Sequence, residues 1–124
     1  MRKKRSLVSV VDDDESIRES LPDLLGELGF ASHAFSSAEE FLASDDIDQT
    51  SCLILDIAMP GMTGPELQRE LMVLRPNIPI IFITAQRDET VRPRLIQLGA
   101  IDCLLKPFSE ADLVKALHAA IQSH

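Results

Sequence analysis

Short apolar runs alternate with amphipathic segments along the whole chain, and four of the runs lead into a polar residue. These runs are Ser6–Val11 before Asp12 and Asp13, Cys52–Leu55 before Asp56, Ile78–Ile83 before Thr84, and Asp102–Leu105 before Lys106. A fifth short run covers Phe30–Phe35. Brief runs rich in Val, Ile and Leu are typical of parallel strands buried on both faces of a sheet.

Between these runs, the spacing of the apolar residues predicts five helices. They cover Glu15–Leu28, Ala38–Ala43, a segment from Pro65 to about Leu74, Asp88–Leu98, and a segment that begins after Ser109. Strands and helices that alternate in this way predict a doubly wound, flavodoxin-like α/β fold. We expect a five-stranded parallel sheet of order 2-1-3-4-5, with the five helices on both faces.

Turn-forming residues mark the ends of these helices. Gly29 and Gly99 are expected to end the first and fourth helices, and Ser36 or Ser37 to cap the second. Pro65 suits the first position of the third helix, and Ser109 with Asp112 resembles a capping box on the fifth. We expect Asp14 and Glu15 to favour the start of the first helix, and the polar Asp45–Ser51 to be a loop.

Two prolines fall inside predicted helices. Pro22 is expected to kink the first helix. Pro93 lies in the middle of the fourth predicted helix, where it lacks an amide donor. Either this helix begins late, near Arg92, or it is bent.

Composition points to one soluble domain formed by residues 1–124. The chain is 26% charged and 45% hydrophobic, which are ordinary values for a globular protein, and no run approaches the roughly 20 apolar residues of a membrane span. The start has no signal-peptide pattern, so we expect a cytoplasmic protein without membrane contact. A net charge of −8 argues against direct binding of nucleic acid by this domain. Cys52 and Cys103, on strands that another strand separates, are expected to be reduced thiols.

The polar residues after the strands point to phosphoryl chemistry. Carboxyl ends of parallel strands meet at one edge of a sheet, so Asp12, Asp13, Asp56, Thr84 and Lys106 should converge there. Three adjacent carboxylates repel one another unless a cation is bound or a pKa is raised. Oxygen ligands favour Mg²⁺, and the three histidines have no spacing that suits zinc. An aspartate can also attack phosphorus as a nucleophile, with Lys106 and Thr84 contacting the phosphate oxygens.

The order of these motifs resembles the receiver domain of bacterial two-component response regulators. The matching residues are Val11-Asp12-Asp13, Leu55-Asp56, Met59-Pro60-Gly61 with Gly64, Thr84-Ala85 and Lys106-Pro107-Phe108. The resemblance implies that Asp56 accepts a phosphoryl group from a sensor histidine kinase. It implies Mg²⁺ bound by Asp12, Asp13, Asp56 and the backbone carbonyl of Ala58, and a cis Pro107 after Lys106. Such a domain is a switch rather than an enzyme, since it catalyses only its own phosphorylation and dephosphorylation.

In this family Thr84 and Lys106 would contact the phosphoryl group. An aromatic residue early on the fifth strand usually turns inward and reshapes the face formed by the fourth helix, fifth strand and fifth helix. That face serves a dimer formed on phosphorylation, or an output domain. Here Cys103 stands where the aromatic residue is expected, and Pro93 falls in the same region.

The sequence of residues 61–67 and 99–102 is similar to that of FixJ-like receivers. Such receivers often precede a DNA-binding output domain in transcription regulators. We expect no such domain within this chain, which is either an excised receiver or a single-domain regulator.

Two other functions compete with this interpretation. Aspartyl phosphatases of the haloacid-dehalogenase kind use a second Asp two residues after the nucleophile, and this chain has Ala58 there. A pseudo-receiver would be a constitutive protein-interaction module. The acids, Thr84 and Lys106 argue against it, while Cys103 and Pro93 leave room for it.

Overall fold

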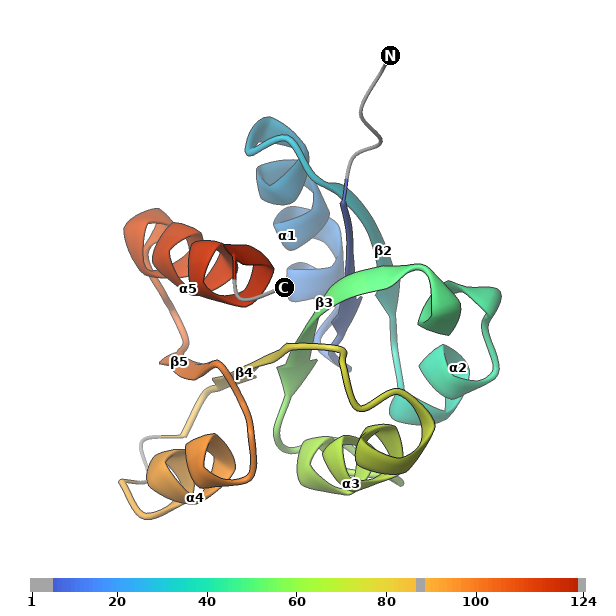
Figure 1. The fold of residues 1–124 in the computed structure, drawn as a ribbon. Coiled ribbons are helices and arrows are strands. Elements are labelled where there is room, and N and C mark those ends of the chain that lie inside the picture. Colours follow the sequence, from blue (N-terminus) through green and yellow to red (C-terminus); the bar gives the residue numbers. More distant parts are fainter. Residues whose placement is uncertain (1–5, 87–88, 123–124) are drawn as a thin grey trace.

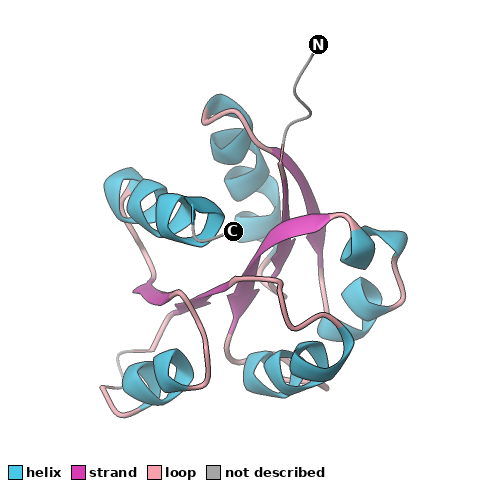
Figure 2. Ribbon diagram, in the orientation of Figure 1, coloured by secondary structure: helices cyan, strands magenta, loops and turns pink. Residues whose placement is uncertain are grey.

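The five predicted strands form one parallel sheet in the computed structural model, which describes residues 6–86 and 89–122. The strand order is β2-β1-β3-β4-β5, as predicted, and helices cover both faces of the sheet (Figure 1; Figure 2). The strands are β1 (Leu7–Val11), β2 (Ala31–Phe35), β3 (Thr50–Asp56), β4 (Ile80–Thr84) and β5 (Asp102–Leu105). The helices are α1 (Glu15–Glu27), α2 (Ala38–Leu42), α3 (Gly64–Leu74), α4 (Val91–Gln97) and α5 (Glu110–Gln122), with a short 3-10 helix, η1 (Asp45–Asp48).

Each face of the sheet has its own apolar core. On one face Val10, Ile54 and Ile83 pack with Leu25 of α1 and Leu117 of α5. The other face has Val11, Leu55 and Phe82 of the sheet packed with α2, α3 and α4, through Phe41, Leu67, Leu71 and Leu95 among others. Because both faces of the sheet are buried, successive residues of a strand are all apolar instead of alternating between apolar and polar.

The parallel register brings the ends of neighbouring strands together. Val11 at the end of β1 pairs with Leu55, Asp56 pairs with Ile83, and Thr84 pairs with Leu105. Asp12, Asp56, Thr84 and Lys106 therefore leave the sheet at one edge.

Several helix ends match the sequence prediction. Asp14 caps α1 by accepting a hydrogen bond from the Ser16 amide, and Ser37 caps α2 by accepting one from the Glu40 amide. Gly29 and Gly99 have φ values of 95° and 110°, which suit glycine after a helix. Ser109 Oγ accepts a hydrogen bond from the Asp112 amide at the start of α5.

Other details of the local prediction were wrong. The segment Asp45–Ser51 is not a plain loop, because its first four residues form η1 and β3 already begins at Thr50. Pro65 is the second rather than the first residue of α3, after Gly64, because Thr63 is the cap. Helix α4 begins at Val91, so of the two alternatives the late start is correct and the bent helix is not needed. Pro93 lies in the first turn of this helix. The predicted start of that helix at Asp88 lies outside the described residues.

Candidate phosphoryl-acceptor site

Asp12 and Asp13 follow β1 and differ sharply in exposure. Asp12 is fully buried, whereas Asp13 is exposed. The main chain of Asp12 is held on both sides, since its amide donates to the Phe35 carbonyl at 3.1 Å and its carbonyl accepts from the Arg18 guanidinium at 3.0 Å. Its Oδ1 accepts from the Asp14 amide at 2.9 Å. The Asp12 carboxylate is thus fixed before any ligand binds.

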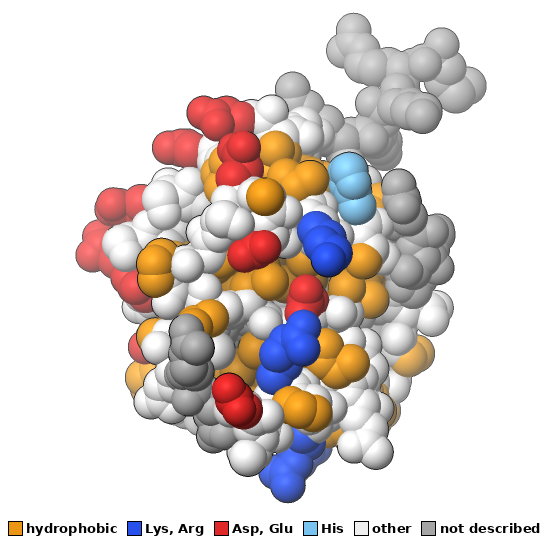
Figure 3. All heavy atoms as spheres, turned by 90° about the vertical axis from the view of Figure 1, so that its left-hand side faces the viewer, with side chains coloured by type: hydrophobic (Ala, Val, Ile, Leu, Met, Phe, Trp, Pro, Cys, Tyr) orange, Lys and Arg blue, Asp and Glu red, His pale blue; other side chains and the backbone are white. Residues whose placement is uncertain are grey.

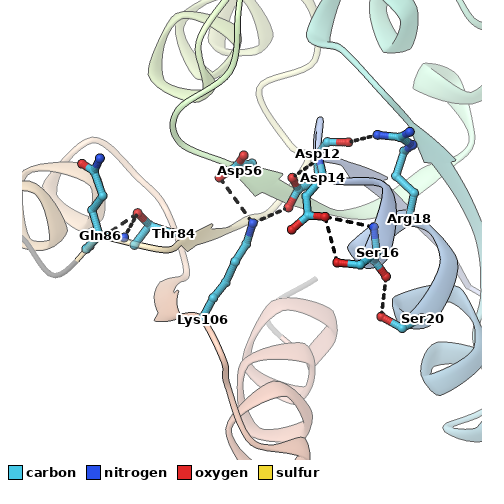
Figure 4. A network of polar contacts seen from close by, with 9 residues as sticks. All are labelled: Asp12, Asp14, Ser16, Arg18, Ser20, Asp56, Thr84, Gln86 and Lys106. Atoms are coloured by element: carbon cyan, nitrogen blue, oxygen red, sulfur yellow. Dashed lines mark hydrogen bonds and ion pairs between the residues drawn. The ribbon is translucent and has the colours of Figure 1, made fainter.

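Asp56 ends β3 and is only 6% exposed. Lys106 reaches it from the loop between β5 and α5, with Nζ 2.8 Å from Asp12 Oδ2 and 3.8 Å from Asp56 Oδ1 (Figure 4). The Lys106 amide donates to the Thr84 carbonyl at 2.7 Å, and the peptide bond to Pro107 is cis, as the family resemblance implied. One ammonium group therefore lies between two buried carboxylates.

The Lys106 ammonium compensates the Asp56 carboxyl only in part. The pKa of Asp56 is raised from 3.8 to about 7, first by burial of the carboxyl and then by the Asp12 charge, while the nearby Lys106 opposes both effects. A carboxyl with such a pKa is partly protonated at neutral pH. A second cation in the site would restore the ionised form that nucleophilic attack needs.

The three acids can supply that cation's ligands. Oxygen atoms of Asp12, Asp13 and Asp56 all lie within 4.8 Å of one another, so the group could bind a metal ion. Asp12 Oδ2 is buried and has no hydrogen bond from the part of the chain that the structure describes, although Lys106 balances its charge. An acceptor with spare lone pairs among carboxylate oxygens fits a hard divalent cation.

Thr84 lies at the same edge of the sheet but its hydroxyl is turned away from the acids. Its Oγ1 accepts from the Gln86 amide at 3.1 Å and lies 3.4 Å from the Gln86 carbonyl (Figure 4). Within residues 6–86 and 89–122, no hydrogen bond joins Thr84 to an acid of the site. The structure brings the three acids and Lys106 together and leaves Thr84 beside them.

Ala58 belongs to the loop between β3 and α3, which is fixed by contacts that the sequence did not predict. The Gly64 amide donates to the Ile57 carbonyl at 2.9 Å, and Glu39 of α2 accepts from the Met62 amide at 3.0 Å. Glu39 and Arg18 were both missed as supporting residues. No sequence signal marks them, because each contacts a main-chain atom that only the folded chain brings near.

Comparison with known proteins agrees with this geometry. Residues 8–118 match the response regulator receiver domain. The chain belongs to the response regulator receiver family. It is therefore not a conventional enzyme, and membership implies a cognate histidine kinase as partner.

Individual relatives share both sequence and fold with the chain. It is 44% identical over 118 residues to nodulation protein W of Bradyrhizobium diazoefficiens, covering 95% of this chain and 52% of that protein. It is 39% identical over 113 residues to the transcriptional regulatory protein FixJ of Rhizobium meliloti, covering 91% and 55%. The crystal structure of FixJ-N superposes with a TM-score of 0.86 at 36% identity, over 98% of each chain. The chain thus spans about half the length of these two curated relatives.

The acidic pocket with Lys106 is consistent with a role in phosphoryl-accepting signalling. The face beyond it, over α4, β5 and α5, carries basic side chains interspersed with acidic and apolar ones (Figure 3). On this face Arg92 of α4 and Asp102 of β5 form an ion pair at 2.7 Å. None of the described helices is long and apolar enough to cross a membrane.

Proposed function

We propose that Asp56 accepts a phosphoryl group from a phosphohistidine of a sensor kinase, in a Mg²⁺-dependent reaction. The pocket of Asp12, Asp13, Asp56 and Lys106 carries this proposal, because a buried carboxylate lies next to a possible metal site and a cation. We take residues 1–124 to be one receiver domain. Its output is a phosphorylation-dependent change of the face formed by α4, β5 and α5.

In the proposed step an Asp56 carboxylate oxygen attacks phosphorus, a new O–P bond forms, and the P–N bond to the histidine breaks. The electron pair of that bond leaves with the imidazole nitrogen. Asp12, Asp13, Asp56 and the Ala58 carbonyl would hold Mg²⁺. The bound ion supplies positive charge that screens the acids and the phosphate oxygens.

Lys106 and Thr84 have separate roles in the proposal. The Lys106 ammonium, 3.8 Å from Asp56, is close enough to bind an oxygen of the new phosphoryl group. The Thr84 hydroxyl, which donates to the Gln86 carbonyl, must give up that bond before it can donate to the phosphoryl group. This exchange would connect phosphorylation to the loop that leads to α4.

The proposal is tested by intact mass after incubation with acetyl phosphate and Mg²⁺. We expect a gain of one phosphoryl group in the parent protein. Asp56→Asn should show no gain, and excess EDTA should abolish the gain in the parent. In a second experiment the donor is a purified sensor kinase domain that carries a phosphohistidine, in place of acetyl phosphate. A folded parent that gains no mass from either donor would refute the proposal.

A pseudo-receiver is the second candidate, favoured by Cys103 at the aromatic position and by the outward Thr84 hydroxyl. It predicts that partner binding and oligomeric state are the same with and without the phosphoryl mimic beryllofluoride. Sedimentation of both forms separates the two functions, because the switch predicts a change, such as a dimer formed on phosphorylation.

A further inference from the structure

A cavity of about 190 Å³ lies between the C-terminal ends of α3 and α4, at the sheet edge opposite the acidic pocket. Its walls are mainly apolar and come from Leu71, Ile78, Ile80 and Leu98 among others. Met72 and Leu98, which line it, are 52% and 43% exposed, so large apolar side chains surround an open hollow. Exposed apolar side chains around a hollow are a feature of ligand and partner sites.

One buried polar side chain that lines this cavity has a carboxamide oxygen without a hydrogen-bond partner among the described residues. Four polar side chains are buried among the described residues: Ser9, Asp12, Asp56 and Gln68. Ser9 bonds to Thr50, and the two aspartates belong to the acidic pocket. Gln68 is only 2% exposed, and its Oε1 has no hydrogen-bond partner within residues 6–86 and 89–122. A buried amide oxygen without a donor is costly, so this acceptor points to a missing hydrogen-bond donor.

The charge in the cavity wall is already neutralised. Of the described residues that line the cavity, only Arg75 is charged. Its guanidinium donates to Asp48 through Nε at 2.8 Å and through a second nitrogen, and to the Leu74 carbonyl at 2.7 Å. An anionic ligand would have to displace Asp48, so the site suits an uncharged molecule.

We propose that this cavity binds a small neutral molecule of about the size of a benzene ring, with one hydrogen-bond donor that Gln68 accepts. Its volume is adequate, since an apolar cavity of about 150 Å³ in another protein binds benzene. The last bond of a glutamine side chain rotates at little cost, which lets Oε1 turn toward the ligand. The ligand would contact both α3 and α4 and so link the two helices.

Phenol is a suitable probe, with fluorobenzene as a ring of similar size without a donor and benzoate as an anionic analogue. We expect saturable shifts in ¹H–¹⁵N spectra at Gln68, Leu71, Ile78, Leu98 and Gly99, with a Kd for phenol on the order of 0.1–1 mM. Fluorobenzene should bind roughly fivefold to tenfold more weakly, because it leaves Oε1 unpaired. Benzoate should produce no shifts at these residues.

The variant Gln68→Leu tests the role of the amide separately from that of the cavity. It should bind phenol and fluorobenzene about equally and still give a cooperative thermal transition. The matched control Gln49→Leu changes an exposed glutamine outside the cavity and should keep the preference for phenol.

Three outcomes would overturn the proposal. They are the absence of saturable shifts at these residues up to about 10 mM phenol, equal affinity of the parent for phenol and fluorobenzene, and shifts at the same residues on dilution without ligand. The last would show that a second copy of the chain covers the cavity. The titration needs no phosphoryl donor and is repeated with Asp56→Asn, so its result is independent of the proposed phosphorylation.

Discussion

Gly64, the first residue of α3, determines how closely that helix approaches the end of β3. A Cβ atom at Gly64 would lie 2.3 Å from the Asp56 carbonyl oxygen, 3.0 Å from Ile57 Cα and 3.1 Å from Phe82 Cε1. An ordinary contact between carbon and oxygen is about 3.3 Å, and a main-chain carbonyl cannot rotate away as a side chain can. The substitution Gly64→Ala must therefore move α3 and the end of β3 apart by about 1 Å.

The cost of this movement follows from the packing of the region. Gly64 is buried, and overpacking of a buried site costs about 1–3 kcal/mol. Alanine regains at most about 1 kcal/mol of helix propensity, less at the first helical position. We expect the free energy of unfolding to fall by about 1–2 kcal/mol, which lowers Tm by roughly 5–10 °C in a domain of this size.

The same movement reaches the acidic pocket, because the displaced carbonyl belongs to Asp56. A shift of about 1 Å at a reacting group can slow a reaction by about a hundredfold. We expect Gly64→Ala to reduce the rate of phosphorylation by acetyl phosphate at least tenfold, under conditions where the variant stays folded.

Urea unfolding and intact mass measure the two effects. Gly26→Ala is the matched control, because a Cβ atom there meets no described residue within 4 Å and Gly26 is exposed in α1. This control should gain up to about 1 kcal/mol and phosphorylate at the parent rate. If Gly64→Ala unfolds at or above the parent's urea midpoint, the close approach of α3 to β3 does not constrain this site and the reasoning fails.

Three further predictions concern other parts of the molecule. In the metal-free protein the pKa of Asp56 is about 7, against an ordinary 3.8, so between these pH values the native Asp56 holds a proton that the unfolded chain has released. The free energy of unfolding should therefore fall as pH rises from 3.8 to about 7. Urea unfolding should show that slope in the parent relative to Asp56→Asn, and an equal slope in both proteins would contradict it. Half-buried Cys103 should react with a thiol reagent in the native protein, whereas buried Cys52, with its pKa raised to about 12, should react only after unfolding. Pro93→Ala should change the free energy of unfolding by less than about 0.5 kcal/mol, because a first-turn amide has no helical partner. Pro22→Ala in the interior of α1 should raise it by about 1–3 kcal/mol, and equal effects of the two substitutions in denaturation experiments would be inconsistent with their helix positions.

The sheet order and the edge that holds the acids could be predicted from sequence because both depend on regular features. Continuous apolar runs mark strands that are buried on both faces, and parallel strands must end at a common edge. Asp12, Asp56 and Lys106 each follow such a run directly. Their approach to one another then requires no information about individual side-chain rotamers.

The start of β3 and the 3-10 helix η1 could not be predicted in this way. Thr50 and Ser51 are polar, so the apolar pattern begins only at Cys52. Thr50 nevertheless pairs with Leu7, and its hydroxyl donates to the Asp46 carbonyl and bonds to Ser9. Such contacts between separate segments replace apolar burial at the end of a strand, and they leave no periodic signal in the sequence.

The orientation of Thr84 was equally beyond prediction, and it bears directly on how a switch without the aromatic residue works. A cavity of only about 50 Å³ lies beside Thr84, and its lining includes Cys103, Val91 and Arg92. Cys103 is far smaller than an aromatic ring, so its rotation cannot displace α4 as a ring would. Arg92 holds α4 to β5 through Asp102, whose carboxylate also accepts from the Cys103 amide at 2.8 Å. We therefore expect any response of α4 to phosphorylation of Asp56 to involve the Thr84 hydroxyl and the Arg92–Asp102 ion pair.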